Sequence, residues 1–220
     1  MLRLERATVE LGGFTILREV TLEVPAGSIV ALIGRNGAGK TTTLRSIMGL
    51  IPMVSGSLSL DGVDLLPLRA HERARIGLSY TPEYRGLVSA LTVEENLLLP
   101  AWAMRFEDAR ARLDTVYALM PEVKQMAARR ATALSGGQQK LVAVARGFLS
   151  GRKLLLLDEP FEGIAPALAQ RLVRGIQELR QAAGQSFSIL LAESELKWAR
   201  LLADRMCTIE RGEILDEVES

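Results

Sequence analysis

The sequence has almost no cysteine, the residue that forms disulfides in oxidising compartments. Cys207 is its one cysteine among 220 residues, so no disulfide can form within the chain and a reducing compartment is expected. We interpret Cys207 as a small hydrophobe buried on a strand. We expect the single histidine, His71, to lie at the surface.

Long apolar runs and an excess of one charge are also missing. No stretch approaches the ~18 to 20 apolar residues of a membrane helix, and the charged N-terminus lacks the apolar core of a signal peptide. The formal net charge is +1, so no overall field attracts nucleic acid or anionic lipid. We expect a cytoplasmic protein with no nucleic-acid partner, which reaches a membrane only through another subunit.

The strongest motif is a glycine-rich stretch between an expected strand and an expected helix. Residues 34–41 read GRNGAGKT, with two glycines separated by four residues and followed by lysine and threonine. The apolar run 28–33 predicts the strand and 42–50 the helix, whose free N–H groups would face an anion. A plain glycine-rich turn is the alternative, which these flanking elements disfavour. We predict that phosphates contact Asn36, Gly37, Ala38, Gly39, Lys40, Thr41 and Thr42, with Lys40 at the terminal phosphates and Thr41 on magnesium.

Two acids end a second apolar run. Four leucines at 154–157 are followed by Asp158 and Glu159. Ligands of open α/β sheets gather at the carboxyl ends of strands, where the glycine-rich stretch also lies. We predict that Asp158 holds magnesium through water and that Glu159 orients and deprotonates an attacking water. The alternative is a turn with two solvated acids, and the phosphate motif in the same chain argues against it.

The remaining pattern predicts an α/β fold with a mainly parallel sheet covered on both faces. An N-terminal antiparallel unit is expected from strands at 2–11 and 19–24 around a Gly12-Gly13 turn. A helical block at about 88–150 lies between two strand regions, so we expect a lobe inserted into a core of residues 1–87 and 151–220. The other expected strands are 57–60, 76–81, 153–158, 187–192 and 206–209, and the other expected helices are 106–120, 138–149, 166–183 (stopped by Gly184) and 195–203.

The stretch Leu134-Ser135-Gly136-Gly137-Gln138 opens one of these helices. A serine and two glycines at a helix start offer free N–H groups and a hydroxyl to an anion, although alone they fit a helix cap equally well. Placed between a phosphate loop and a strand that ends in Asp-Glu, the stretch resembles the signature motif of ABC-transporter ATPases.

This resemblance covers nearly the whole chain and implies a P-loop, RecA-like core, ATP hydrolysis and head-to-tail dimerisation with a second ABC ATPase subunit. Each of two ATP molecules, with Mg2+, would lie between the phosphate loop of one subunit and Ser135, Gly136, Gly137 and Gln138 of the other. Closing and reopening the pair would drive transmembrane permease subunits on the inner face of the cell membrane.

Further residues are similar to one branch of the family. Glu83, which follows the strand at 76–81, takes the place of a usual glutamine and is expected near the metal. Together with 91–97 and 162–166, it looks like the ATPases of branched-chain amino acid, urea and amide importers. Those systems pair two unlike ATPases with two permeases and a periplasmic binding protein.

Four features depart from the family plan or leave alternatives open. The adenine-stacking aromatic would align near Leu11, so Phe14 is a candidate substitute or merely packs under the loop. Ser194 takes the place of the usual histidine at the γ-phosphate, which predicts slow hydrolysis. Glu162-Gly163-Ile164 replaces a small residue, leucine and aspartate. The run 84–88 is either a docking groove for a permease helix or a packed hinge.

Two functions other than transport remain as alternative hypotheses. The chain would act as a nucleotide-dependent dimerising clamp, or as a regulatory half-site of low activity. Balanced charge argues against nucleic-acid work, and the presence of both Lys40 and Glu159 argues against complete inactivity.

Overall fold

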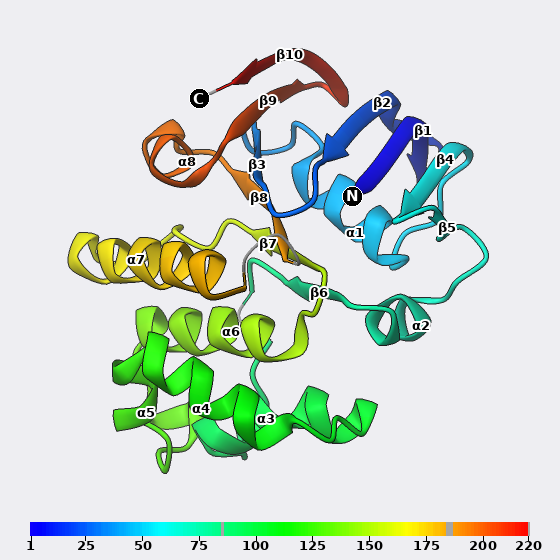
Figure 1. Cartoon of the computed structure of the whole chain (residues 1–220). Coiled ribbons are helices and arrows are strands. Elements are labelled where there is room, and N and C mark those ends of the chain that lie inside the picture. The colour runs from blue at the N-terminus through cyan, green and yellow to red at the C-terminus, as the bar shows by residue number, and fades with distance from the viewer. Residues whose placement is uncertain (85, 184–186, 220) are drawn as a thin grey trace.

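Two β-sheets organise the chain, and helix α1 packs against strands of both (Figure 1). The computed structural model describes residues 1–84, 86–183 and 187–219. The strands are β1 (Leu2–Leu11), β2 (Phe14–Val24), β3 (Ile29–Ile33), β4 (Ser55–Leu60), β5 (Val63–Asp64), β6 (Leu78–Thr81), β7 (Leu154–Asp158), β8 (Ser188–Glu193), β9 (Arg205–Glu210) and β10 (Glu213–Glu219). The helices are α1 (Lys40–Met48), α2 (Ala70–Arg75), α3 (Val93–Met104), α4 (Ala109–Leu119), α5 (Pro121–Gln125), the 3-10 turn η1 (Ala131–Ala133), α6 (Gly136–Ser150), α7 (Pro166–Ala183) and α8 (Leu196–Leu202).

The smaller sheet is antiparallel, in the order β2-β1-β4-β5. Gly12 and Gly13 both have positive φ, the backbone that a two-residue hairpin turn needs, and Leu11 pairs with Phe14 across it. The predicted turn is therefore confirmed. The second strand begins at Phe14, five residues before the expected start at 19, because the pairing continues to the turn.

The larger sheet has the order β10-β9-β3-β8-β7-β6, and all of its strands are parallel except β10. The predicted mainly parallel sheet is confirmed, but β10 was not predicted. It is an edge strand rich in acidic residues, and an irregularity between Ile214 and Asp216 breaks the alternation that would have revealed it.

Alternate residues of the parallel strands face opposite ways and feed two cores. Val30 and Leu32 join a core shared with α1 and the antiparallel sheet. Ile29 and Ala31 join a second core shared with α6, α7, α8 and the helices beyond them. This double burial explains the nearly continuous apolar runs of β3, β7 and β8.

Helices α3 to α6 lie together on the side of the larger sheet away from the antiparallel sheet (Figure 1). We propose that residues 88–150 are the inserted lobe and that 1–87 with 151–220 form the core. The helix expected at 106–120 is present as α4 over 109–119, and its residues Leu113, Val116 and Tyr117 are buried. The short, charged α2 was not predicted.

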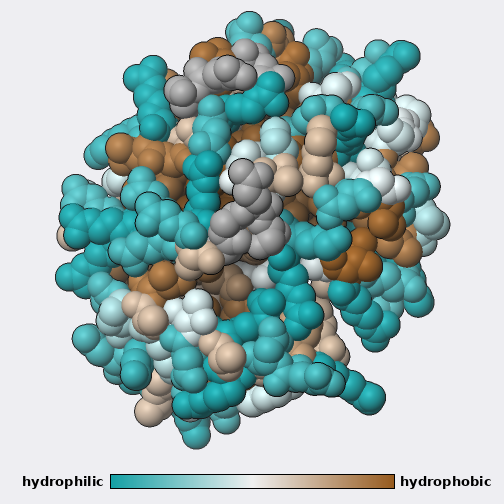
Figure 2. All heavy atoms as spheres, in the orientation of Figure 1, coloured by the Kyte–Doolittle hydropathy of each residue, from teal (hydrophilic) through white to brown (hydrophobic). Residues whose placement is uncertain are grey.

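Helix α1 begins at Lys40 and ends at Met48, two residues earlier at each end than expected. Cys207 is buried on β9 and His71 is exposed, as predicted. The predicted stop at Gly184 lies outside the described residues. None of the helices in the part of the chain that the structure describes is both long and apolar enough to cross a membrane. Hydrophilic side chains cover most of the face in Figure 2, and the hydrophobic ones form separate groups.

Candidate functional site

The loop between β3 and α1 leaves the start of α1 open. Gly39 is the N-cap of α1 with φ of 116°, and no side chain caps the helix. A Cβ at Gly34 would come within 2.4 Å of the Ile209 carbonyl oxygen, so only glycine allows β9 to pass so closely. The first N–H groups of α1 are thus available to an anion.

A cavity of about 460 Å³ lies over this helix start. Glu83 and Glu159 line it from the two loops that follow β6 and β7. Leu11, Ile16 and Glu162 also line it, of which Ile16 was not singled out by the sequence. The lining residues that the sequence predicted as phosphate contacts are Asn36, Gly37, Gly39, Lys40, Thr41 and Thr42.

Lys40 is 4% exposed and is held by its own loop and by an acid. Its Nζ donates to the carbonyl oxygens of Gly34 at 2.7 Å and Arg35 at 3.2 Å. The same atom lies 2.9 Å from Glu159 Oε1 and 3.0 Å from Ser194 Oγ. Lys40 and Glu159, which belong to two motifs far apart in the sequence, therefore meet directly.

Ser194 connects three predicted site residues. Its Oγ lies 2.6 Å from Glu159 Oε1 and 3.0 Å from Asn36 Oδ1, so the hydroxyl donates to one of these acceptors while it accepts from Lys40. Its backbone N–H donates to Glu159 Oε2 at 3.1 Å. Glu159 has φ of 46°, the left-handed region that non-glycine residues seldom adopt.

Asp158 is held by two hydroxyls. Thr41 Oγ1 donates to Oδ1 at 3.0 Å and Tyr80 OH donates to Oδ2 at 2.9 Å. Burial raises the pKa of Asp158, while the hydrogen bonds from Tyr80 and Thr41 oppose that rise. Thr41 and Asp158 thus place two oxygen atoms side by side, and oxygen is the ligand type that Mg2+ prefers. Tyr80 was missed, although its place three residues before Glu83 is a usable signal.

A second carboxyl group, Glu193, lies behind Glu159 and was not predicted. It is 1% exposed, at the end of β8, and its Oε1 accepts from the N–H of Phe161 at 3.1 Å. Burial, followed by the charge of Glu159, raises the pKa of Glu193 to about 8. Burial works to raise the pKa of Glu159 too, but hydrogen bonds from Ser194 and Lys40 hold that pKa below its usual range.

The start of α6 differs from that of α1 because its own side chains satisfy it. Ser135 Oγ accepts from the Gln138 N–H at 3.3 Å, and Gln138 Oε1 accepts from the Ser135 N–H at 3.0 Å. Ser135 is exposed and Gly136 half-buried, so another molecule can reach them. A Cβ at Gly137 would meet Leu168 Cδ2 at 2.9 Å, which gives this glycine a packing reason.

The structure does not bring Phe14 to the cavity. Phe14 is 74% exposed on the hairpin, and Leu11 and Ile16 form the cavity wall on that side.

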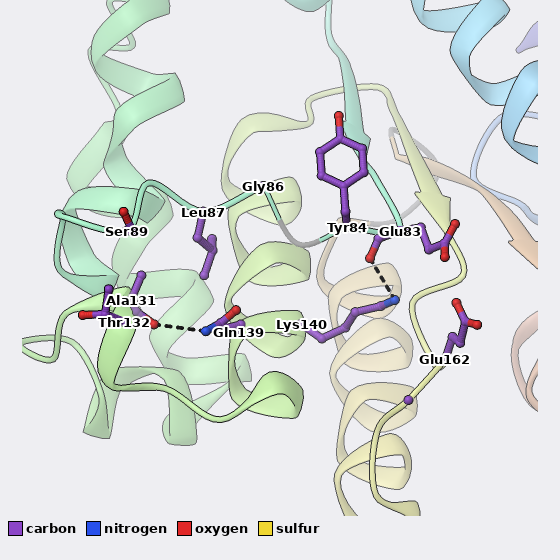
Figure 3. A pocket seen from close by; sticks show the side chains of 11 residues that line it. Glu83, Tyr84, Gly86, Leu87, Ser89, Ala131, Thr132, Gln139, Lys140 and Glu162 are labelled. Carbon is purple, nitrogen blue, oxygen red and sulfur yellow. Dashed lines mark hydrogen bonds between the residues drawn. The ribbon is translucent and has the colours of Figure 1, made fainter.

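A second cavity, of about 620 Å³, lies between the loop after β6, α6 and the loop after β7 (Figure 3). Within the run 84–88, Tyr84 is 69% exposed, whereas Leu87 packs against the core of the helical block. Arg85 lies outside the described residues. The exposed Tyr84 thus supports the docking groove, and the packed Leu87 supports the hinge.

Comparison with known proteins shows the family to which the chain belongs. A family model described as ABC transporter matches residues 17–162. The chain is 37% identical over 215 residues to the high-affinity branched-chain amino acid transport ATP-binding protein BraG of Pseudomonas aeruginosa, covering 98% of this chain and 91% of that one. It is 32% identical over 214 residues to the probable branched-chain amino acid transport ATP-binding protein LivF of Archaeoglobus fulgidus, covering 97% of this chain and 90% of that one.

Other relatives are named for phosphonates import and lipopolysaccharide export. A solved structure described as the ATP binding subunit of an ABC transporter superposes with a TM-score of 0.87 at 28% identity, covering all of this chain and 90% of that one.

Proposed function

Because the chain belongs to the ABC transporter family as an ATP-binding subunit that hydrolyses ATP, we propose that it powers import of branched-chain amino acids or of related small polar solutes such as urea or amides. The proposed ATP hydrolysis is supported by one observation: Lys40, Glu159 and Ser194 are in contact beside the uncapped start of α1. The cargo rests on the resemblance of Glu83 and 162–166 to the amino-acid importer branch, together with the similarity to BraG and LivF.

The phosphates of ATP bind at the start of α1 in this proposal. The helix N–H groups and Lys40 are the donors, and Lys40 exchanges its contacts with Gly34, Arg35 and Glu159 for phosphate oxygens. Thr41, Asp158 and Glu83 would hold Mg2+, which would neutralise charge at the phosphates.

Glu159 is the general base. Its carboxylate is kept ionised by Lys40 and Ser194, and its left-handed backbone fixes where it points. Binding of phosphate by Lys40 frees the Glu159 carboxylate to accept a proton from water. Ser194 offers one hydroxyl at the position where the family resemblance implies a histidine, so we expect slow turnover at this site.

The signature residues Ser135, Gly136, Gly137 and Gln138 act on the nucleotide of a second ATPase subunit. Ser135 is exposed and the other three are half-buried at the start of α6, which supports this role because another chain can reach them. We propose that the pair, of identical or unlike chains, works at the cytoplasmic face of the membrane through permease subunits, with a periplasmic binding protein delivering the solute.

Transport itself tests the cargo. The chain, its partner ATPase and the permeases of the same system are reconstituted in liposomes, and ATP-dependent uptake of labelled leucine, urea and a phosphonate is compared in the presence of the binding protein. We expect uptake of leucine or urea only. Uptake of the phosphonate alone would reject the amino-acid branch and leave the ATPase assignment intact.

A second candidate, a half-site of low activity, is favoured by one observation, the serine at position 194. Glu159→Gln in this chain is compared with the equivalent change in the partner subunit, with ATP turnover measured for each complex. A smaller loss from the change in this chain supports a weak site here, and equal losses argue against it.

We also propose that Tyr84 docks a permease helix in the 620 Å³ cavity (Figure 3). Tyr84→Ala is expected to lower transport while MgATP binding stays unchanged, because Tyr84 is exposed and makes no part of the phosphate cavity. Intact transport in this variant would remove the docking role.

A further inference from the structure

Lys140 is a buried cation between the signature helix and the loop that carries Glu83. It lies on α6, in the second turn after Ser135, and is 4% exposed. Its Nζ donates to the carbonyl oxygen of Glu83 at 3.2 Å, as Figure 3 shows. Within the described residues this is its one hydrogen bond, although an ammonium group has three donors.

Acidic side chains surround this lysine. Burial lowers the pKa of Lys140, and the charges of Glu162, Glu193, Glu83 and Glu159 oppose that effect. The carboxyl groups of Glu83 and Glu162 lie on the same side of the cavity as the Lys140 ammonium in Figure 3. Burial and then the neighbouring Glu83 raise the pKa of Glu162, as expected for two carboxyls that repel each other.

Helix α6 holds the same loop at other points. Arg146 Nη1 donates to the Gly86 carbonyl oxygen at 2.8 Å. Thr81 Oγ1, at the end of β6, donates to the Ala143 carbonyl oxygen at 3.5 Å. The helix that begins with the signature serine is therefore attached to the strand end and loop from which Glu83 reaches the nucleotide cavity.

We propose that Lys140 is a positioning residue that ties the Glu83 loop to the signature helix and provides the positive charge that allows a glutamate, rather than a neutral side chain, to stand at position 83. The inference rests on the proposed role of Glu83 at the metal-bound nucleotide. Without Lys140, the Glu83 carboxylate repels Glu162 and the phosphates, and the loop loses its tie to α6. A neutral amide at position 83 removes the need for that positive charge.

A double-mutant cycle tests this assignment. Lys140→Met keeps the length and apolar stem of the buried side chain and removes its charge, and Lys124→Met removes an exposed lysine of the same lobe as the matched control. Lys140→Met is expected to raise KM for MgATP so that kcat/KM falls about tenfold, the size of coupling found between contacting groups. Lys124→Met is expected to change neither constant, and Lys140→Arg to restore part of the loss.

The decisive comparison is made in the Glu83→Gln background. There Lys140→Met is expected to lower kcat/KM less than about twofold, because position 83 no longer needs a positive charge beside it. Equal losses in both backgrounds, or an equal loss in Lys124→Met, would overturn the role of Lys140 and leave the ATPase site intact. A wild-type chain without MgATP hydrolysis would overturn both. Thermal unfolding checks that each variant folds, and Lys140→Gln replaces Lys140→Met if the latter does not.

Discussion

The starts of α1 and α6 look alike in sequence but differ in structure. The start of α1 follows a glycine-rich loop, α6 itself begins with Gly136 and Gly137, and both starts were predicted to face phosphate. The start of α1 has no side-chain cap, and its lysine is drawn onto loop carbonyls and Glu159. The start of α6 is closed by reciprocal hydrogen bonds between Ser135 and Gln138.

Because of this difference, we expect the phosphate site at α1 to form within one chain and the phosphate site at α6 to depend on a second subunit. At α1 the helix N–H groups are available to phosphate before any partner arrives. At α6 a ligand must replace the hydroxyl contact of Ser135, and in the proposed dimer the facing subunit brings that ligand. We therefore expect changes at α1 to act on the isolated chain and changes at α6 to act only in the assembled complex.

The largest effect is expected at the base beside α1. Glu159→Gln removes the proton acceptor and should lower ATP turnover by roughly 10²–10⁴-fold. MgATP binding should persist, because the amide leaves Lys40 free for phosphate. Turnover and binding of a fluorescent ATP analogue are measured on the same preparation. Turnover within twofold of wild type would show that another group is the base.

Lys40→Met should come next. Losing a charged hydrogen-bond donor to phosphate costs about 1.5–3 kcal/mol, or roughly 10 to 100-fold in affinity. Titration calorimetry with MgATP on the isolated chain measures the change. Unaltered affinity would mean that phosphate does not bind at the start of α1, and the comparison with α6 would fail.

Ser135→Ala sharpens the comparison because a matched control exists. Thr92 caps α3 of the same lobe through an equivalent box with Glu95. Both Ser135→Ala and Thr92→Ala should lower the free energy of unfolding by about 1 kcal/mol. Only Ser135→Ala should also lower turnover of the assembled complex, roughly tenfold, by losing a hydroxyl contact to phosphate. Equal turnover in the two variants would reduce Ser135 to a helix cap.

The smallest effect concerns Glu193 and pH. Its pKa is raised from 4.5 to about 8, so the folded chain holds a proton that the unfolded chain has released. The contribution of Glu193 to the free energy of unfolding is therefore largest below about pH 4.5 and is lost as the pH rises towards 8. Melting temperatures of wild type and Glu193→Gln should therefore diverge over that range, with wild type falling further. Parallel curves would show that Glu193 is ionised throughout.

The motifs predicted the parts of the site that adjoin a strand end or a helix start. Lys40, Thr41, Asp158 and Glu159 lie in local patterns whose geometry follows from a strand that ends at a known edge. Glu193 and Lys140 were not predicted, because their proximity to Glu159 and Glu83 depends on how β8 and α6 pack.

The strands that the sequence revealed differ in burial from the one that it did not reveal. The double-sided burial of β3, β7 and β8 gives strong apolar runs, which a sequence reveals directly. The strand β10 pairs on one side only and carries acids, so its pattern is weak. Gly137 was predicted as an opening for a ligand and stays a prediction, while the crowding that a Cβ there would meet at Leu168 is a tertiary constraint that no local pattern contains.

Amide hydrogen exchange tests the joint use of the two helix starts most directly. The Glu159→Gln chain is studied in complex with its partner subunits, with and without MgATP, and exchange is followed at residues 37–42 and 136–138. We predict that MgATP protects both segments together, because each nucleotide contacts one of each across the subunit interface. Protection at 37–42 with unchanged exchange at 136–138 would contradict a shared nucleotide and leave α6 with a capped start that binds nothing.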